Sequence, residues 1–171
     1  MPGDVDMELE TRLGFLDTQS FERLGLNFQH AALNTFELLC STDRLFHITT
    51  SVVKREIESH ITDSIKEALA ALKSFRRKAR ILAGTANESM RVLFAETDEK
   101  QIFLESQNVF EGFLRRTSAT VLTVTSINPE DILQLYFGSM PPFGEGQKKS
   151  EFPDAFSIAA LAFHARSPGK N

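Results

Sequence analysis

Cysteine is nearly absent from this sequence, which has a single one, Cys40, and tryptophan is absent altogether. One cysteine excludes an intramolecular disulfide and a cysteine-rich zinc site, and it favours a reducing environment. The sequence also lacks a run of about 18 apolar residues, so we expect no membrane-spanning helix. Residues 1–6 are acidic and lack the basic and then apolar order of a secretion signal. We therefore predict a cytoplasmic protein without membrane contact.

Positive charge is also in short supply, because the 171 residues carry a formal net charge of −4. This balance excludes binding of nucleic acid through bulk positive charge, and any such contact must be local. Basic residues gather in three short clusters, which we interpret first as solvated faces. They are Arg76, Arg77 and Lys78 with Arg80; Arg115 and Arg116; and Lys148 and Lys149. The third cluster lies close in sequence to Asp154 and could contact a phosphate backbone.

Several common signatures of catalysis are missing. The sequence has no glycine-rich phosphate loop that ends in Lys-Ser or Lys-Thr, no Gly-x-Ser-x-Gly, and no histidine pair at metal-binding spacing. Its four histidines are scattered along the chain. These absences argue against phosphate-loop nucleotide hydrolases, serine hydrolases and histidine-ligated zinc enzymes.

Apolar patterning predicts strands that alternate with helices. The apolar residues 13–16 predict a first strand, buried on both faces, that ends at Asp17. A helix over 31–40, a strand over 45–49 and a helix from about 52 to 61 follow, the last capped by Thr50 or Ser51. Residues 62–116 are helical in character, with a break marked by Gly84 and Asn87.

The second half of the chain predicts one more strand and two helices. The strand covers 121–124, and Asn128 caps a helix that has Pro129 at its first position and ends by Gly138. Residues 140–149 predict a loop, and Pro153 starts a last helix from 154 to about 166. Because this helix is apolar almost all round, we expect it to be buried.

The alternating elements predict an α/β fold, a three-layer sandwich with a parallel central sheet between helices. We expect one domain over 1–171, made of a β-α-β-α part (12–61), a helical insertion (62–116), and a third strand with a final helix (117–171). Ligands of such sheets bind at the carboxyl ends of the strands.

Three acidic residues fall at such positions. Asp17 ends the first strand, Glu56 shares the inward face of its helix with Val53, and Asp154 lies in the first turn of the last helix. Clustered carboxylates repel one another unless a hard divalent cation binds between them, and such an ion activates water for phosphodiester hydrolysis. Each residue also has an ordinary interpretation: Asp17 as a cap, Glu56 as a solvated acid, Asp154 as a first-turn acid.

Residues 14–18, 49–57 and 148–161 together resemble the three sequence blocks of PIN domains, in the bacterial subgroup with a long helical insertion. The resemblance implies a nuclease, usually an RNase, that uses Mg²⁺ or Mn²⁺ held by three or four acidic residues, and for this chain we predict an endoribonuclease. By this resemblance Asp17, Glu56 and Asp154 take the first three acidic positions. We expect Thr18, Lys148 and Lys149 to contact the RNA substrate.

Two departures from the PIN pattern open alternatives. Gln19 stands where the family often has Asn or another small polar residue, and the sequence ends at Asn171 before a further strand and its acidic block. From the second we expect weak activity, self-association, and an open sheet edge that is met by a partner chain or left exposed. An antitoxin or another protein is a further possible partner. The main alternative function is a catalytically silent module that binds RNA or protein. A phosphotransferase with Asp17 as nucleophile is weaker, because that chemistry requires a second Asp where Gln19 stands.

Overall fold

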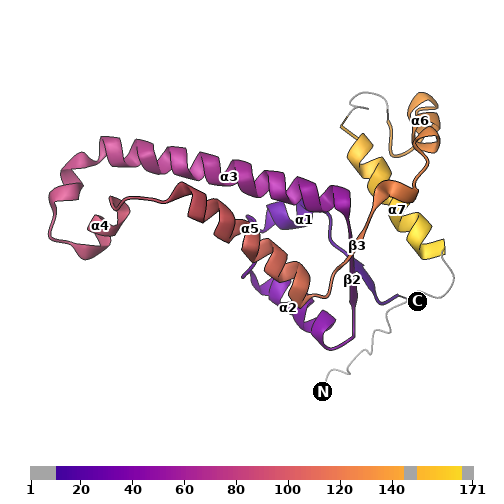
Figure 1. Cartoon of the computed structure of the whole chain (residues 1–171), viewed down its shortest axis with the longest axis horizontal. Coiled ribbons are helices and arrows are strands. Elements are labelled where there is room, and N and C mark those ends of the chain that lie inside the picture. Colours follow the sequence, from indigo (N-terminus) through magenta and orange to yellow (C-terminus); the bar gives the residue numbers. More distant parts are fainter. Residues whose placement is uncertain (1–10, 145–149, 167–171) are drawn as a thin grey trace, which may run out of the picture. The chain divides into compact units, whose positions relative to one another are not determined.

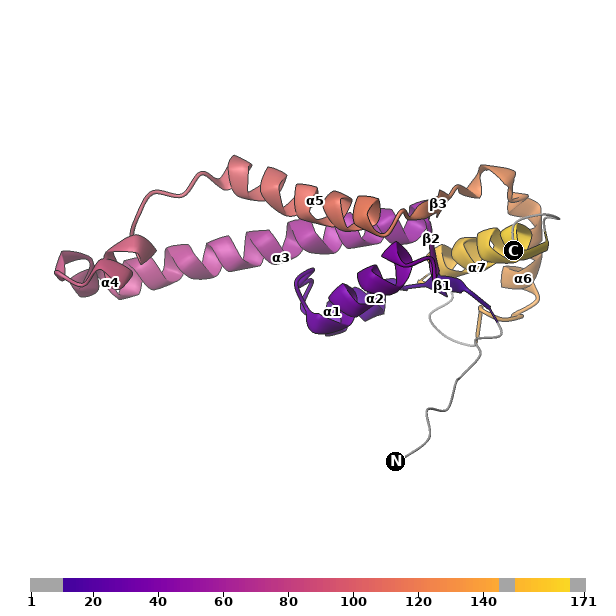
Figure 2. The ribbon, with the colours of Figure 1, turned by 90° about the horizontal axis from the view of Figure 1, so that it is seen from below.

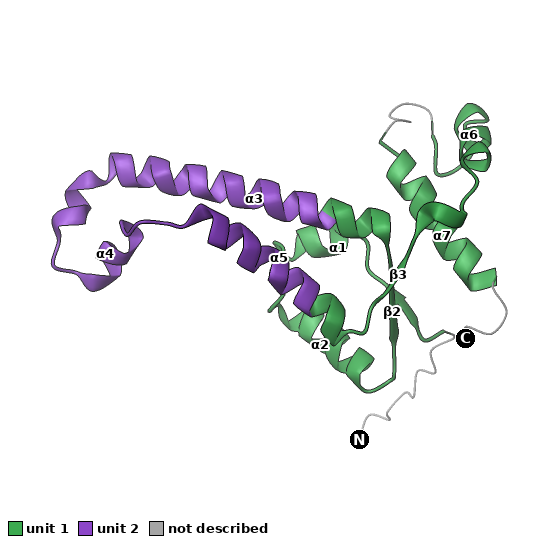
Figure 3. Cartoon of the chain, viewed as in Figure 1, with its two compact units in different colours: residues 1–56, 113–171 green, residues 57–112 purple. Residues whose placement is uncertain are grey.

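The computed structural model describes residues 11–144 and 150–166, which form two compact units (Figures 1 and 3). Unit 1 comprises Met1–Glu56 and Phe113–Asn171, and unit 2 comprises Ile57–Gly112. The elements in chain order are β1 (Leu13–Phe15), α1 (Thr18–Arg23), α2 (Ala31–Ser41), β2 (Phe46–Thr50), α3 (Ser51–Lys78), η1 (Arg80–Gly84), α4 (Glu88–Leu93), α5 (Glu99–Arg116), β3 (Thr120–Leu122), η2 (Val124–Ser126), α6 (Pro129–Phe137) and α7 (Phe152–Arg166).

A parallel sheet with the order β1-β2-β3 forms the centre of unit 1, which confirms the predicted sheet. Leu13 pairs with Phe46, and Ile48 pairs with Thr120. The central strand β2 is buried from its second residue to its last. By contrast β1 is only half-buried, so the prediction that it is buried on both faces is wrong. The reason is its place in the sheet, because β2 is its one neighbour among the described strands.

Helices cover both faces of this sheet. In two perpendicular views α1 and α2 lie on one face, and α6 and α7 lie on the other (Figures 1 and 2). On the first face Phe21 and Phe28 pack against Phe113, with ring centroids 5.8 and 5.9 Å away. On the second face Ile132 and Phe143 form a separate buried cluster with residues of α7. The predicted α/β architecture of three layers is confirmed.

Gly14 has a packing role in β1. A Cβ atom there would lie 3.0 Å from Cε2 of Phe36, a tight contact that the Phe36 ring could relieve only by shifting. Because Gly14 has no Cβ atom, the Phe36 ring lies close to the strand and meets the ring of His47 edge-on, with ring centroids 5.0 Å apart. Burial in these aromatic surroundings lowers the pKa of His47 to about 4.

The predicted helix starts are confirmed by hydrogen bonds. Thr50 Oγ1 accepts the Val53 N–H at 3.1 Å, and Asn128 accepts the Glu130 N–H at 3.1 Å with Pro129 in the first helical position. Three elements differ from the prediction. The helix expected over 52–61 continues to Lys78, and α1 lies in a segment for which no helix was predicted. The strand expected over 121–124 ends at Leu122, and η2 begins at Val124.

The expected burial of α7 is wrong. Ala155, Ser157 and Ala160 are buried against the rest of unit 1, whereas Ile158 and Phe163 are 53% and 55% exposed. An apolar circumference can be covered only where other elements supply a surface. Here α7 packs on η2, β2, β3 and α6, and these elements reach only part of its circumference.

Unit 2 is helical. Its α3 and α5 segments are joined through η1 and α4, and the predicted break is present, since η1 ends at Gly84 and Asn87 caps α4. Arg76 donates to the Leu93 carbonyl at 2.6 Å and to Thr97 Oγ1 at 2.8 Å, which ties the end of α3 to the segment around α4. In the described part of the chain, no helix is both long and apolar enough to cross a membrane.

Candidate metal centre

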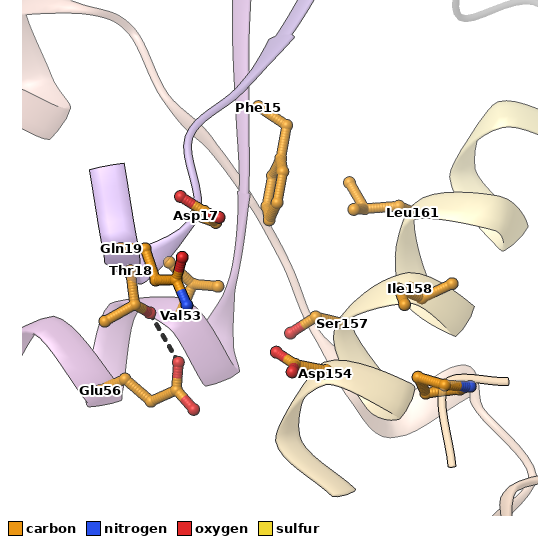
Figure 4. A pocket seen from close by; sticks show the side chains of 11 residues that line it. Phe15, Asp17, Thr18, Gln19, Val53, Glu56, Asp154, Ser157, Ile158 and Leu161 are labelled. Atoms are coloured by element: carbon orange, nitrogen blue, oxygen red, sulfur yellow. Dashed lines mark hydrogen bonds between the residues drawn. The ribbon is translucent and has the colours of Figure 1, made fainter. Parts of the chain in front are cut away.

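A pocket of about 260 Å³ in unit 1 brings the three predicted acidic residues together (Figure 4). Asp17 follows β1, Glu56 lies in the second turn of α3, and Asp154 lies in the first turn of α7. All three line the pocket, at the edge of the sheet where the parallel strands end. The other lining residues are Phe15, Thr18, Gln19, Val53, Pro142, Ser157, Ile158 and Leu161.

Asp17 is the N-cap of α1. Its Oδ1 accepts the backbone N–H of Ser20 at 2.8 Å and also the Ser20 hydroxyl. The interpretation of Asp17 as a cap is therefore correct, and it does not compete with a place in the pocket. Because both hydrogen bonds go to Oδ1, the second oxygen remains available to a ligand.

Glu56 is half-buried and receives a hydrogen bond from the first residue of α1. The Thr18 hydroxyl donates to Glu56 Oε2 at 2.6 Å, the short length typical of a hydroxyl on a charged carboxylate (Figure 4). This contact joins residues 38 positions apart and ties α1 to α3. The substrate contact expected of Thr18 stays a prediction.

Asp154 has a raised pKa. Its partial burial is the largest cause, followed by the negative charges of Glu56, Glu151 and Asp17. Each of these effects disfavours the charged form of the carboxyl group. The two other acidic residues of the pocket are therefore close enough to Asp154 to repel it.

The chemistry of this donor set fits a hard divalent cation, because the pocket offers carboxylate oxygens whose mutual repulsion a cation would offset. In the described ranges, 11–144 and 150–166, no three His, Cys, Asp or Glu side chains stand at metal-binding spacing. Coordination of one ion by all three acids therefore requires side-chain rotation. Glu56 and Asp154 lie on helix turns, where their side chains can change rotamer without any change of the backbone.

Sequence reasoning missed Ser157 as a pocket residue. Ser157 follows Asp154 by three positions and so lies on the same face of α7, which was the available signal. It shares a buried hydrogen bond of 3.0 Å with Thr50, which was predicted only as a helix cap. Lys148 and Lys149, expected to contact the substrate, lie outside the described residues.

The parallel sheet between helices and the pocket with three carboxylates at its edge place this protein among the α/β domains with an acidic site. The sequence matches the family model described as PIN domain over residues 15–171, and the chain belongs to this family. PIN domains are typically nucleases, they act on nucleic acids, and they generally use divalent metals. The comparisons with curated proteins and with solved structures gave no match.

Proposed function

We propose that this PIN domain is a metal-dependent endoribonuclease that hydrolyses RNA phosphodiester bonds with Mg²⁺ or Mn²⁺ held by Asp17, Glu56 and Asp154. One observation carries the proposal: these three residues, from distant parts of the sequence, line one pocket, and the charges of the first two help raise the pKa of the third. Such mutual repulsion is a feature of cation sites and is costly in a site without that use.

The residues around the pocket have separate tasks in this mechanism. When bound, the ion supplies an activated water and neutralises charge that develops on the phosphate. Thr18 holds Oε2 of Glu56, which leaves Oε1 for the ligand. Asp17 is fixed through its cap bonds to Ser20, so its position follows from the start of α1. RNA contacts by Thr18, Lys148 and Lys149 belong to the same proposal.

Cleavage of an unstructured RNA in the presence of Mn²⁺, Mg²⁺ or EDTA tests the proposal. The expected result is internal cleavage that requires the ion and is lost in Glu56→Gln. Glu130→Gln is the matched control, because Glu130 is an exposed acid in the first turn of α6 and does not line the pocket. Equal activity of the wild type and Glu56→Gln would contradict the proposal.

A catalytically silent module is the alternative function, and Gln19 in the pocket favours it. Mn²⁺ separates the two. A nuclease gains thermal stability from the ion and cleaves RNA with it, whereas a silent module does neither and still binds RNA or a protein.

The partner proposals concern the free side of β1 and the exposed side of α7. Within the described chain β1 pairs with β2 alone, and Ile158 of α7 is 53% exposed. An edge strand and exposed apolar side chains are features that bind a further chain. We propose a second copy or an antitoxin-like protein as that chain. Sedimentation velocity over a range of concentrations tests the first of these, and a monomer at every concentration would contradict it.

A further inference from the structure

A buried pair of hydroxyl groups joins two of the segments that carry the acidic residues. Thr50 Oγ1 and Ser157 Oγ lie 3.0 Å apart, although the two residues are 107 positions apart in sequence. Thr50 is 0% exposed and Ser157 is 5% exposed. Because both side chains are buried, the low local dielectric strengthens the bond.

The Thr50 end of the pair sets the start of α3. Besides the bond to Ser157, Thr50 Oγ1 accepts the N–H of Val53 at 3.1 Å. Val53 lines the pocket, and Glu56 follows it by one turn on the same face. The position of the Glu56 carboxylate therefore depends on where Thr50 anchors the first turn of this helix.

The Ser157 end of the pair sets the position of α7. Asp154 lies three residues earlier, on the same face of the helix and about 4.5 Å away along its axis at a rise of about 1.5 Å per residue. Both side chains project from α7 into the pocket (Figure 4). One hydrogen bond therefore joins the end of β2, where the helix that carries Glu56 begins, to the helix that carries Asp154.

We propose that Thr50 and Ser157 are positioning residues of the metal centre, which fix the separation of the Glu56 and Asp154 carboxylates and thereby set the affinity for the ion. This inference rests on the proposed function. Groups that orient metal ligands without touching the ion typically change affinity by about 10–100-fold when they are removed. A purely structural role would change stability and leave affinity unchanged.

Mn²⁺ affinity, measured by electron paramagnetic resonance of the free ion, together with melting temperature tests the inference on the full chain. We expect Ser157→Ala and Thr50→Val to raise the Mn²⁺ dissociation constant about tenfold, and Thr50→Ser to restore it. Ser157→Ala leaves the helix cap in place, so the test stands even where Thr50→Val unfolds the protein.

Thr117→Val is the matched control. Thr117 is also buried, and its hydroxyl lies 2.8 Å from Nδ1 of His47, in a pair away from the pocket. This variant is expected to lower the melting temperature and to bind Mn²⁺ as the wild type does. Unchanged affinity in Ser157→Ala, or an equal loss in Thr117→Val, would overturn the inference alone. A wild-type protein that binds no Mn²⁺ would overturn the proposed function and this inference with it.

Discussion

Asp17 has two roles that substitution can separate, one as the cap of α1 and one as a charge in the pocket. Asn is as good a helix cap as Asp and keeps an oxygen for the Ser20 N–H, but it lacks the charge. Ala removes both the cap and the charge. The comparison of the wild type with Asp17→Asn therefore isolates the charge, and the comparison of Asp17→Asn with Asp17→Ala isolates the cap.

The expected magnitudes differ clearly between the two variants. Loss of the cap costs about 1 kcal/mol, which for a chain of this size puts the melting temperature of Asp17→Ala about 2–4 °C below that of Asp17→Asn. In Asp17→Asn the ion-free melting temperature should stay level or rise, since one of the charges that raise the pKa of Asp154 is removed. Above the pKa of Asp154 that removal relieves repulsion between two carboxylates.

Mn²⁺ adds the second comparison. At about one hundred times its dissociation constant, the ion stabilises the folded wild type by about 2.7 kcal/mol, or about 5–11 °C. With affinity reduced about a hundredfold in Asp17→Asn, the same concentration should shift the melting temperature by less than about 2 °C. Cleavage of RNA should be lost in this variant.

Thermal unfolding followed by circular dichroism, with and without Mn²⁺, measures both effects. A full Mn²⁺ shift or full Mn²⁺-dependent cleavage in Asp17→Asn would show that Asp17 is no ligand. If the melting temperature without Mn²⁺ fell as far in Asp17→Asn as in Asp17→Ala, Asn would not preserve the cap, and this reasoning would be refuted.

Three further predictions concern single contacts. Thr18→Val removes the hydroxyl that donates to Glu56 and should weaken Mn²⁺ binding by about tenfold, whereas Thr18→Ser should not; equal affinities by calorimetry would contradict this. His47 titrates near 6.5 when unfolded and at about 4 when folded, so its contribution is present above pH 6.5 and is lost as pH falls toward 4. Between pH 7 and 4 the free energy of unfolding, measured with urea, should therefore fall by about 3 kcal/mol more in the wild type than in His47→Leu. Equal falls in the two proteins would refute the lowered pKa of His47. Gly14→Ala should cost about 1–3 kcal/mol through its contact with Phe36, and Gly14→Ala in a Phe36→Leu background should cost less.

Local sequence signals predicted most of the elements of unit 1. Thr50 and Asn128 act as caps at the predicted helix starts, because a cap depends only on residues within one turn. The missed α1 has a single buried residue, Phe21, so it lacks the apolar repeat that identifies a helix. Its signal was the cap, Asp17 with Ser20, which was considered only as an ordinary interpretation of Asp17.

Long-range contacts could not be predicted in this way. The bond from Thr18 to Glu56 and the pair of Thr50 and Ser157 depend on how β1, α3 and α7 meet, which no local pattern encodes. The prediction that Ile158 is buried was wrong for the same reason, since an apolar helix surface does not show which part of it the neighbouring elements cover. The metal role of the three acidic residues stays a prediction until the ion is tested.

The chain crosses between its two units inside helices, at Glu56 and Ile57 in α3 and at Gly112 and Phe113 in α5. All three acidic residues of the pocket lie outside 57–112. For protein engineering, residues 57–112 are therefore an exchangeable cassette whose helices must keep their rotational phase at both crossings. Deleting about seven residues from each helix removes close to two full turns and nearly keeps that phase. Deleting only two residues would rotate the rest of the helix by about 200°. A ligand-binding helical hairpin grafted at these crossings would couple a sensor to the start of the helix that carries Glu56.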